Sequence, residues 1–319
     1  MRSDLIDNRI LKQLSQQIKA GKWATTYIFT GKENERKKAL ALAFAKALNC
    51  EKGGITCKCL ICTRIDEGNF PDVKWYGADE EAASIKIADV RDFKNWLSLK
   101  PFEGKVKMFI FNQAERLTGE AQNALLKSLE EPPPGNVIVL LVPKSESLYD
   151  TIVSRSIEIK VPSFSSQEIK EILIKEAVEK NEAEVLARMS HGELTRAREA
   201  YANKLFRQKN QWIDQLVKSP TLFLEQFQSS TRNELTSVFD FLMEWFRDLL
   251  AYYASRDPQF LIHLDRQALI ATAIQGHDFD SLAETLENLH RLRKSLDDYA
   301  NQKLVVTQTQ ILLEHFVQK

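Results

Sequence analysis

Four cysteines are the residues whose types and spacing point most directly to chemistry. All of them lie in one stretch, CEKGGITCKCLIC, and the other residues of the 319-residue chain include no further cysteine. A secreted disulfide framework would spread its cysteines along the chain, whereas tight clustering without secretory features favours a metal. Four thiolates can close a tetrahedral Zn²⁺ site, which is structural because no coordination position stays open. The predicted ligands are Cys50, Cys57, Cys59 and Cys62, and the alternative is a set of reduced thiols without metal.

A second candidate site is the stretch IFTGKENERKKAL, residues 28–40. In a phosphate-binding loop, glycines let backbone N–H groups wrap the phosphates, a lysine reaches the β/γ-phosphates, and a Ser or Thr hydroxyl ligates Mg²⁺. Gly31 and Lys37 occupy the first glycine and the lysine of that pattern. Arg36, however, stands at the second glycine, and Lys38 stands at the hydroxyl position. The stretch is therefore either a degenerate phosphate loop or an ordinary strand-to-helix turn, and ATP binding is not expected.

Both stretches lie in a segment that alternates between strand and helix patterns. Continuous apolar runs predict buried strands, and amphipathic or alanine-rich segments between them predict helices. The expected strands cover residues 25–30, 72–76, 106–111, 137–142 and 156–161, and the expected helices 4–20, 37–48, 87–97 and 118–131. Such an order indicates a parallel sheet covered by helices on both faces. Beyond Pro162 only helical patterns remain, so we expect an α/β domain over 1–162, a small helical domain over 163–205 and a helical C-terminal domain over 206–319.

Composition limits the class of protein. The apolar share of 44% supports sizeable cores, and no apolar run approaches the roughly 18 residues of a spanning helix. The N-terminus lacks the apolar middle of a secretory leader, so a cytoplasmic location is expected. Lys+Arg and Asp+Glu balance at 44 each, whereas strong DNA binding by a chain acting alone depends on excess basic charge. The main partner is therefore expected to be protein.

Two longer strings carry a family resemblance. LSLKPFEGKVKMFIFNQAERLTGEAQNALLKSLEEPPPGNVIVLLV, residues 97–142, and TIVSRSIEIKVP, residues 151–162, resemble the AAA+ subunits of bacterial replicative clamp loaders. Within that family they are most similar to the delta-prime subunits of the DNA polymerase III holoenzyme, and next to the ATP-hydrolysing gamma/tau subunits. The resemblance is strong over the first 200 residues and weak from Phe206 onward. It implies an AAA+ P-loop-type domain with a zinc-module insertion at 50–62, followed by a helical lid domain and an all-α collar domain for oligomerisation.

The resemblance also implies that ATP hydrolysis has been lost. Working members of the family follow the strand that corresponds to 106–111 with Asp-Glu, which organises Mg²⁺ and activates water. This chain has Asn112-Gln113, and an amide neither accepts the water's proton nor neutralises a divalent cation. The sensor position, usually polar, is Val142-Pro143. These replacements, together with Arg36, favour a subunit that binds no ATP.

Ser154-Arg155-Ser156 resembles the Ser-Arg-Cys motif of the family, whose arginine projects into the ATP site of a neighbouring subunit. A guanidinium at that position offsets the charge that develops on the transferred phosphoryl group. The resemblance therefore implies that Arg155 is an arginine finger acting in trans, and the alternative is a surface arginine in an ion pair.

The family also inserts a four-cysteine zinc module after the first helix of the α/β domain, where this chain carries its cysteines. One departure is that Cys57-x-Cys59 stands where the family commonly has Cys-x-x-Cys. The shorter spacing is expected to strain the binding of one ion by both neighbours.

The leading hypothesis is thus a non-hydrolysing, delta-prime-like subunit of the DNA polymerase III clamp loader. Its expected partners are gamma/tau-like ATPase subunits and a delta-like subunit in a hetero-oligomeric ring, with the sliding clamp and primer-template DNA reached through the complex and no membrane. One alternative is an ATP-hydrolysing gamma/tau-like subunit. The other is a stand-alone zinc-module protein that binds nucleic acid.

Overall fold

A computed structural model describes residues 3–52, 57–77 and 84–317 of the chain. The chain forms two compact units. The first extends to Glu168 and includes Gly192–Thr195, and the second contains Ile169–His191 and everything from Arg196 onward. None of the helices in the described residues is long and apolar enough to cross a membrane.

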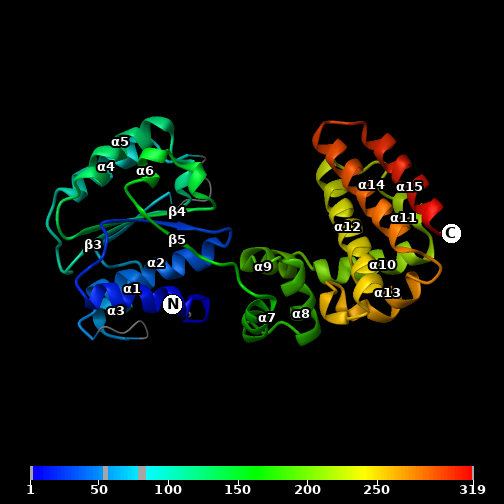
Figure 1. Ribbon diagram of the computed structural model, residues 1–319, viewed down its shortest axis with the longest axis horizontal. Helices are drawn as coiled ribbons and strands as arrows, with labels where there is room; N and C mark the ends of the chain where they lie inside the picture. Colours follow the sequence, from blue (N-terminus) through cyan, green and yellow to red (C-terminus); the bar gives the residue numbers. More distant parts are fainter. Residues whose placement is uncertain (1–2, 53–56, 78–83, 318–319) are drawn as a thin grey trace. The chain divides into compact units, whose positions relative to one another are not determined.

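The first unit is built on a five-stranded parallel sheet with the strand order β2-β3-β4-β1-β5 (Figure 1). Each strand pairs in parallel with its neighbours, so the carboxyl ends of all five meet at one edge. The strands are β1 (Thr26–Thr30), β2 (Val73–Tyr76), β3 (Lys107–Phe111), β4 (Asn136–Val142) and β5 (Ile157–Lys160). Four of them fall within segments predicted from apolar runs, β4 begins one residue before its predicted segment, and the predicted parallel α/β class is confirmed.

Helices cover both faces of this sheet. In Figure 1, α1, α2 and α3 lie on one side of the strands and α4, α5 and α6 on the other. The helices are α1 (Asn8–Lys19), α2 (Asn34–Asn49), α3 (Leu60–Asp66), α4 (Ile87–Leu97), α5 (Gly119–Glu130) and α6 (Asp150–Val153), with short 3₁₀ turns at Ser3–Leu5, Ala114–Arg116 and Ser145–Ser147. Thr118 caps α5, because its side chain accepts a hydrogen bond from the Ala121 N–H.

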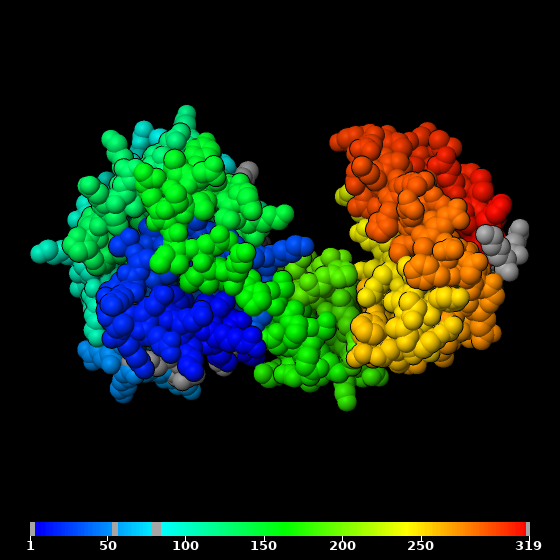
Figure 2. Space-filling view, in the orientation of Figure 1, coloured from blue at the N-terminus to red at the C-terminus, as the bar shows by residue number. Residues whose placement is uncertain are grey.

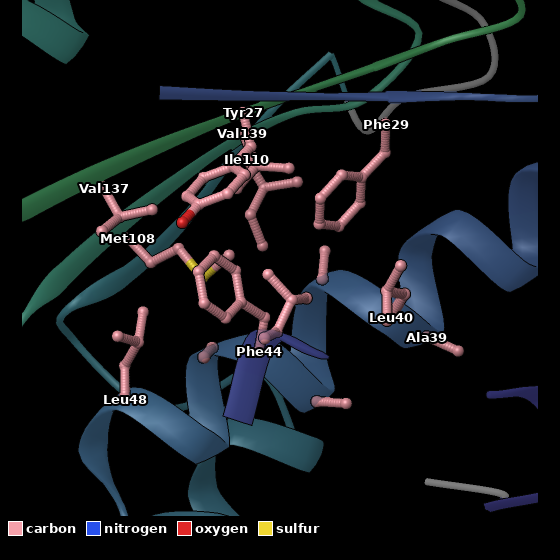
Figure 3. Close-up of a cluster of buried hydrophobic side chains, with 14 of the residues drawn as sticks. Tyr27, Phe29, Ala39, Leu40, Phe44, Leu48, Met108, Ile110, Val137 and Val139 are labelled. Carbon is pink, nitrogen blue, oxygen red and sulfur yellow. The ribbon is translucent and has the colours of Figure 1, made fainter. Parts of the chain in front are cut away.

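The core follows from the two-residue period of the strands, because successive side chains point to opposite faces. Tyr27 and Phe29 of β1 pack toward α2, where Phe44 and Leu40 meet them (Figure 3). Ile28, between them in sequence, belongs to the cluster on the other face. β1, β3 and β4 are buried at every position, whereas the residues of edge strand β5 are mostly exposed. Full cover on both faces was therefore predicted correctly for the central strands but not for β5, which has a neighbour on one side only.

The remaining helices are α7 (Ser166–Lys175), α8 (Lys180–Met189), α9 (Leu194–Ala202), α10 (Leu205–Lys218), α11 (Pro220–Glu225), α12 (Arg232–Ser255), α13 (Gln267–Ala273), α14 (Phe279–Asp297) and α15 (Gln302–Val317), with 3₁₀ turns at Pro258–Phe260 and Leu264–Arg266. From α10 onward they enclose one apolar core that includes Trp245 and Phe246, two consecutive aromatic residues on α12. This part of the chain is entirely helical over its described residues, as the sequence predicts.

Candidate functional site

The stretch predicted to be either a degenerate phosphate loop or an ordinary turn joins β1 to α2, at the carboxyl edge of the sheet. Gly31 follows β1, and its N–H points to the carbonyl oxygens of Val142 and Pro143, 3.2 and 3.1 Å away. Its φ is +145°, and a Cβ at this position would lie 2.2 Å from the carbonyl oxygen of Val161. Close packing of the loop against the end of β5 therefore requires glycine here, independently of any phosphate.

Lys37, which stands at the lysine position of the phosphate-loop pattern, points into the protein. Its Nζ donates a hydrogen bond to the carbonyl oxygen of Val142 at 2.8 Å, and the residue is 2% exposed. Burial lowers the pKa of this ammonium to about 8, although Glu115 and Glu33 act to raise it. The lysine thus contacts the last residue of β4, the position at which the sequence places the lost sensor residue.

Arg36, at the second-glycine position, also forms its contacts within the first unit. Its guanidinium donates to the carbonyl oxygen of Ser163 at 3.0 Å and forms an ion pair with Glu168 at 2.7 Å. It also lies over the ring of Phe164, 4.4 Å from the centroid. The residue is only 4% exposed, so its long side chain is buried next to the loop. Its contacts with Ser163 and Glu168 hold the segment that follows β5 against the start of α2.

Glu33 caps the N-terminus of α2 and contacts a second helix end as well. One carboxylate oxygen accepts the N–H of Glu35 at 2.9 Å, and the other accepts the N–H of Leu194, the first residue of α9, at 2.5 Å. Helix N-termini favour anions because their N–H groups are unpaired and the helix dipole is positive there. Desolvation raises the pKa of Glu33, opposed by these two backbone hydrogen bonds. A carboxylate of the chain itself therefore lies at the N-terminus where a phosphate loop would bind phosphate.

Asn112, one of the two amides that the family resemblance compares with an acidic pair, also takes part in internal contacts. Asn112 follows β3 and accepts a hydrogen bond from the side-chain amide of Asn34 at 3.1 Å. Its own Nδ2 donates to the carbonyl oxygen of Gly77 at 3.4 Å. Gln113 has φ of 54°, in the left-handed region, at the turn out of β3. Asn112 thus ties the ends of β3 and β2 to the start of α2.

The Ser154-Arg155-Ser156 segment lies in the turn between α6 and β5. Ser154 and Ser156 both direct their hydroxyls back to helix carbonyls, with bonds to Thr151 at 3.2 Å and Ile152 at 2.8 Å. Arg155 is 37% exposed. In the space-filling view, the green segment around residue 150 lies on the surface of the first unit (Figure 2). Both serine hydroxyls thus bond to their own helix, and the arginine side chain is partly exposed.

Two groups of the chain hold the Arg155 guanidinium. Nη1 donates to the carbonyl oxygen of Thr151 at 3.0 Å, and Nη2 lies 2.9 Å from a carboxylate oxygen of Glu130. Glu130 is the last residue of α5 and is 49% exposed. The ion pair predicted as the alternative role of Arg155 is therefore present, and it lies at the surface.

The four cysteine sulfurs come together. Cys50 follows α2, Cys59 precedes α3 and Cys62 lies within α3, a helix that the apolar periodicity did not predict. All four sulfur atoms lie within 4.8 Å of one another, and those of Cys50 and Cys59 are 3.8 Å apart. Residues 53–56 of the segment lie outside the described residues. The Cys57-x-Cys59 spacing therefore does not keep the two neighbours from a common centre.

This geometry fits a tetrahedral metal. Zn–S bonds of about 2.3 Å in a tetrahedron place sulfurs about 3.8 Å apart. Burial and contact with the sulfurs of Cys59 and Cys50 raise the pKa of the Cys62 thiol in the absence of a cation, and a divalent ion reverses such a shift because it favours the thiolate. No other group of three or more His, Cys, Asp or Glu side chains in the described residues is close enough to bind a metal ion.

Two residues of these sites gave no recognisable signal in the sequence. Glu33 contacts Leu194 across 161 positions, and Glu130 contacts Arg155 across 25. Ser, Thr, Asp and Asn are the residues that mark a helix N-cap, so a glutamate at position 33 did not stand out as one. The pairing of Glu130 with Arg155 depends on the packing of α5 beside α6, which no local pattern specifies.

The chain matches two families along most of its length. The family described as "DNA polymerase III, delta subunit" matches residues 6–165, just over half of the chain. The family described as "DNA polymerase III, delta subunit, C terminal" matches residues 196–315.

Individual relatives agree with this. DNA polymerase III subunit delta' of Bacillus subtilis is 29% identical over 294 residues, covering 88% of this chain and 86% of the relative. DNA polymerase III subunit tau of Escherichia coli is 29% identical over 194 residues, which cover 58% of this chain but only 30% of tau. A solved DNA polymerase III gamma subunit-related protein of Thermotoga maritima gives a TM-score of 0.48 at 20% identity, covering 96% of this chain and 98% of that chain. Because this score is below 0.5, that likeness adds nothing to the assignment. The two matched families assign the chain to the DNA polymerase III delta-subunit family, and across most of its length it resembles a delta' subunit.

Proposed function

We propose that the chain is a non-hydrolysing, delta-prime-like subunit of the DNA polymerase III clamp loader and that Arg155 serves a neighbouring ATPase subunit as an arginine finger. The observation that carries this proposal is the arrangement of Ser154-Arg155-Ser156, in which the serines bond to their own helix and the guanidinium stays accessible. An arginine that reaches another subunit must be exposed and weakly held, and Arg155 meets both conditions.

The chemistry of the finger is electrostatic. Phosphoryl transfer concentrates charge on the transferred group, and a guanidinium that approaches it lowers the barrier without taking part in bond making. Arg155 has five N–H donors in a fixed fork, which matches phosphate oxygens better than an ammonium does. The chain's contribution to hydrolysis is therefore made at a site whose nucleotide is held by its neighbour.

The chain's own loop is proposed not to take ATP. Glu33 places a carboxylate at the N-terminus of α2, Lys37 bonds to Val142, and Arg36 fills the second-glycine position. A triphosphate would have to displace a like-charged carboxylate from the backbone donors. A titration of the isolated chain with MgATP is expected to show no binding in the micromolar range. Micromolar affinity would favour a gamma/tau-like ATPase instead.

The assembly is proposed to be a hetero-oligomeric ring. Residues 206–319 serve as the collar that joins gamma/tau-like ATPase subunits and a delta-like subunit, residues 163–205 as the lid, and residues 1–162 as the AAA+ domain. The ring places the sliding clamp on primer-template DNA. A gel shift of the isolated chain at moderate salt is expected to show no DNA binding, because its net charge is zero. A clear shift would favour the stand-alone nucleic-acid binder.

Zinc is the proposed occupant of the cysteine site, bound by Cys50, Cys57, Cys59 and Cys62 to close the loop between α2 and α3. The convergence of the four sulfurs supports this proposal. Protein purified without chelator is expected to contain about one zinc per chain, since four thiolates saturate one ion. Less than half an equivalent would contradict zinc and leave reduced thiols as the alternative.

The finger is tested by Arg155→Ala in the reconstituted complex. We expect the variant to fold and assemble normally and to slow DNA- and clamp-stimulated ATP hydrolysis, because an arginine finger contributes about 10³-fold or more at the site it serves. Arg64→Ala is the matched control, since Arg64 is also a half-exposed arginine in a surface ion pair, with Glu103. Unchanged turnover with Arg155→Ala would refute the finger.

A further inference from the structure

We infer that Glu130 is a positioning residue for Arg155: its carboxylate holds the guanidinium in a resting position that competes with the triphosphate of the neighbouring subunit. This inference rests on the proposed finger role of Arg155. It adds to that role a second residue, on a different helix, that sets how readily the finger is released.

The geometry places the two charged groups in direct contact. Nη2 of Arg155 is 2.9 Å from a carboxylate oxygen of Glu130, and Nη1 is 3.0 Å from the carbonyl oxygen of Thr151. Both side chains of the pair are substantially exposed, at 37% and 49%. An exposed ion pair contributes little because water screens it and two long side chains lose freedom. The contact is therefore strong enough to orient the guanidinium but weak enough to be exchanged for a phosphate.

The position of Glu130 is not explained by the stability of its own helix. It is the last residue of α5, where the dipole is negative and a carboxylate is unfavourable. Glu131 follows it directly, so two negative charges stand at this helix end. The Arg155 guanidinium offsets this charge, so Glu130 and Arg155 each stabilise the other's charged group. A solvent-facing glutamate elsewhere on the helix would lack such a partner.

The backbone that carries Glu130 is well defined. Pro132, Pro133 and Pro134 follow the helix, and proline fixes φ and cannot continue a helix. The carbonyl oxygen of Pro133 accepts a hydrogen bond from the side chain of Asn136 at 2.9 Å, which ties the turn to the start of β4. The carboxylate is thus presented from a fixed frame, whereas Arg155 reaches it by a long and flexible side chain. Of the two partners, the arginine is the one able to leave.

Competition between carboxylate and phosphate has a definite consequence for rate. Carboxylate and phosphate both offer anionic oxygens to the same guanidinium fork, so the finger cannot serve both fully at once. The equilibrium between the resting and the engaged arginine includes the free energy of the Glu130 contact. Removing the charge of Glu130 is expected to shift Arg155 toward the neighbour's ATP and to raise hydrolysis in the absence of clamp and DNA by about two- to fivefold, the range of an exposed ion pair.

Glu130→Gln in the reconstituted complex is the test, with ATP turnover measured at saturating ATP in the absence of clamp and DNA. The matched control is Glu131→Gln, which removes the same charge at the same helix end, because no ion pair between Glu131 and Arg155 occurs in the described part of the chain. We expect Glu130→Gln to raise basal turnover by the stated factor and Glu131→Gln to leave it unchanged.

The double variant Glu130→Gln/Arg155→Ala separates positioning from a structural role. If Glu130 acts through the arginine, the double variant hydrolyses ATP at the rate of Arg155→Ala alone, because no finger remains to be released. A change that persists in the Arg155→Ala background would assign Glu130 a structural role and overturn the inference. The inference would also be overturned if Glu130→Gln had an unchanged or lower rate while Arg155→Ala was slow. If Arg155→Ala has the turnover of the unmodified complex, it is the proposed finger that fails.

Discussion

Arg36 and Arg155 are two arginines of one α/β unit with opposite surroundings. Arg36 is buried and directs its guanidinium to backbone carbonyls, a carboxylate and an aromatic ring of the same unit. Arg155 lies at the surface, where one carbonyl and one exposed carboxylate hold it. Both stand at positions that the family resemblance marks as relevant to ATP, but only the second has its donors within reach of another molecule.

The contrast separates side chains that pair within the fold from one that stays accessible. At the turn between β1 and α2, Glu33, Arg36 and Lys37 each pair with a backbone group of the same unit. At the Arg155 turn the donors are left partly uncommitted. The first region stabilises the fold and the second is available for a partner, and this division can be tested by asking which arginine matters for stability and which for assembly chemistry.

The largest expected effect is the loss of folding stability in the Arg36→Ala variant. The substitution removes a buried guanidinium and leaves Glu168 and two carbonyl oxygens without their partner, so we expect a loss of about 3 kcal/mol in the free energy of unfolding. Arg155→Ala should lose about 1 kcal/mol or less, because its ion pair is exposed. Urea denaturation of the two variants measures both values. Equal losses would remove the distinction between the two regions.

A smaller effect is expected for Glu33→Ala. This carboxylate accepts backbone N–H groups from two helix ends, so its loss should destabilise the protein by about 2 kcal/mol. Asp7→Ala is the control, since Asp7 caps α1 alone and should lose about 1 kcal/mol. Hydrogen exchange at the Leu194 N–H should accelerate in Glu33→Ala only. Equal destabilisation of both variants would mean that the bond to Leu194 adds nothing.

The smallest effect concerns Lys37 and pH. The pKa of Lys37 is about 8 in the folded chain, below its ordinary 10.5. Between these values the unfolded chain holds a proton that the folded chain has lost, so raising the pH through this window favours the folded state. The Lys37→Met variant has no ionisable side chain at this position, so its stability lacks this contribution to the pH dependence. The unfolding free energy of the unmodified protein should therefore rise relative to that of Lys37→Met as the pH increases from about 8 to about 10. Parallel pH profiles for the two proteins would contradict the depressed pKa.

Much of the fold could be predicted because local patterns are enough to set it. The apolar run at 137–142 became most of β4, which is fully buried, and the predicted helix over 118–131 contains α5. The helix α3 was not predicted, because its seven residues are too few to show a period and its place is set by the cysteines on either side of its start. The exposed edge strand β5 was predicted as a strand but not as exposed, since sheet order is not a local property.

The sequence by itself determined the family and the parallel α/β class, and it pointed to the four cysteines as candidate metal ligands and to Arg155 as a candidate arginine finger. These depend on residue types and on periods of two to four positions, which the chain carries locally. Only the tertiary structure decided that the four sulfurs converge, that Glu33 joins α2 to Leu194, and that Glu130 meets Arg155. Each of these contacts joins residues from different elements. Their distances are fixed by the packing of helices against the sheet, which no segment of the sequence specifies alone.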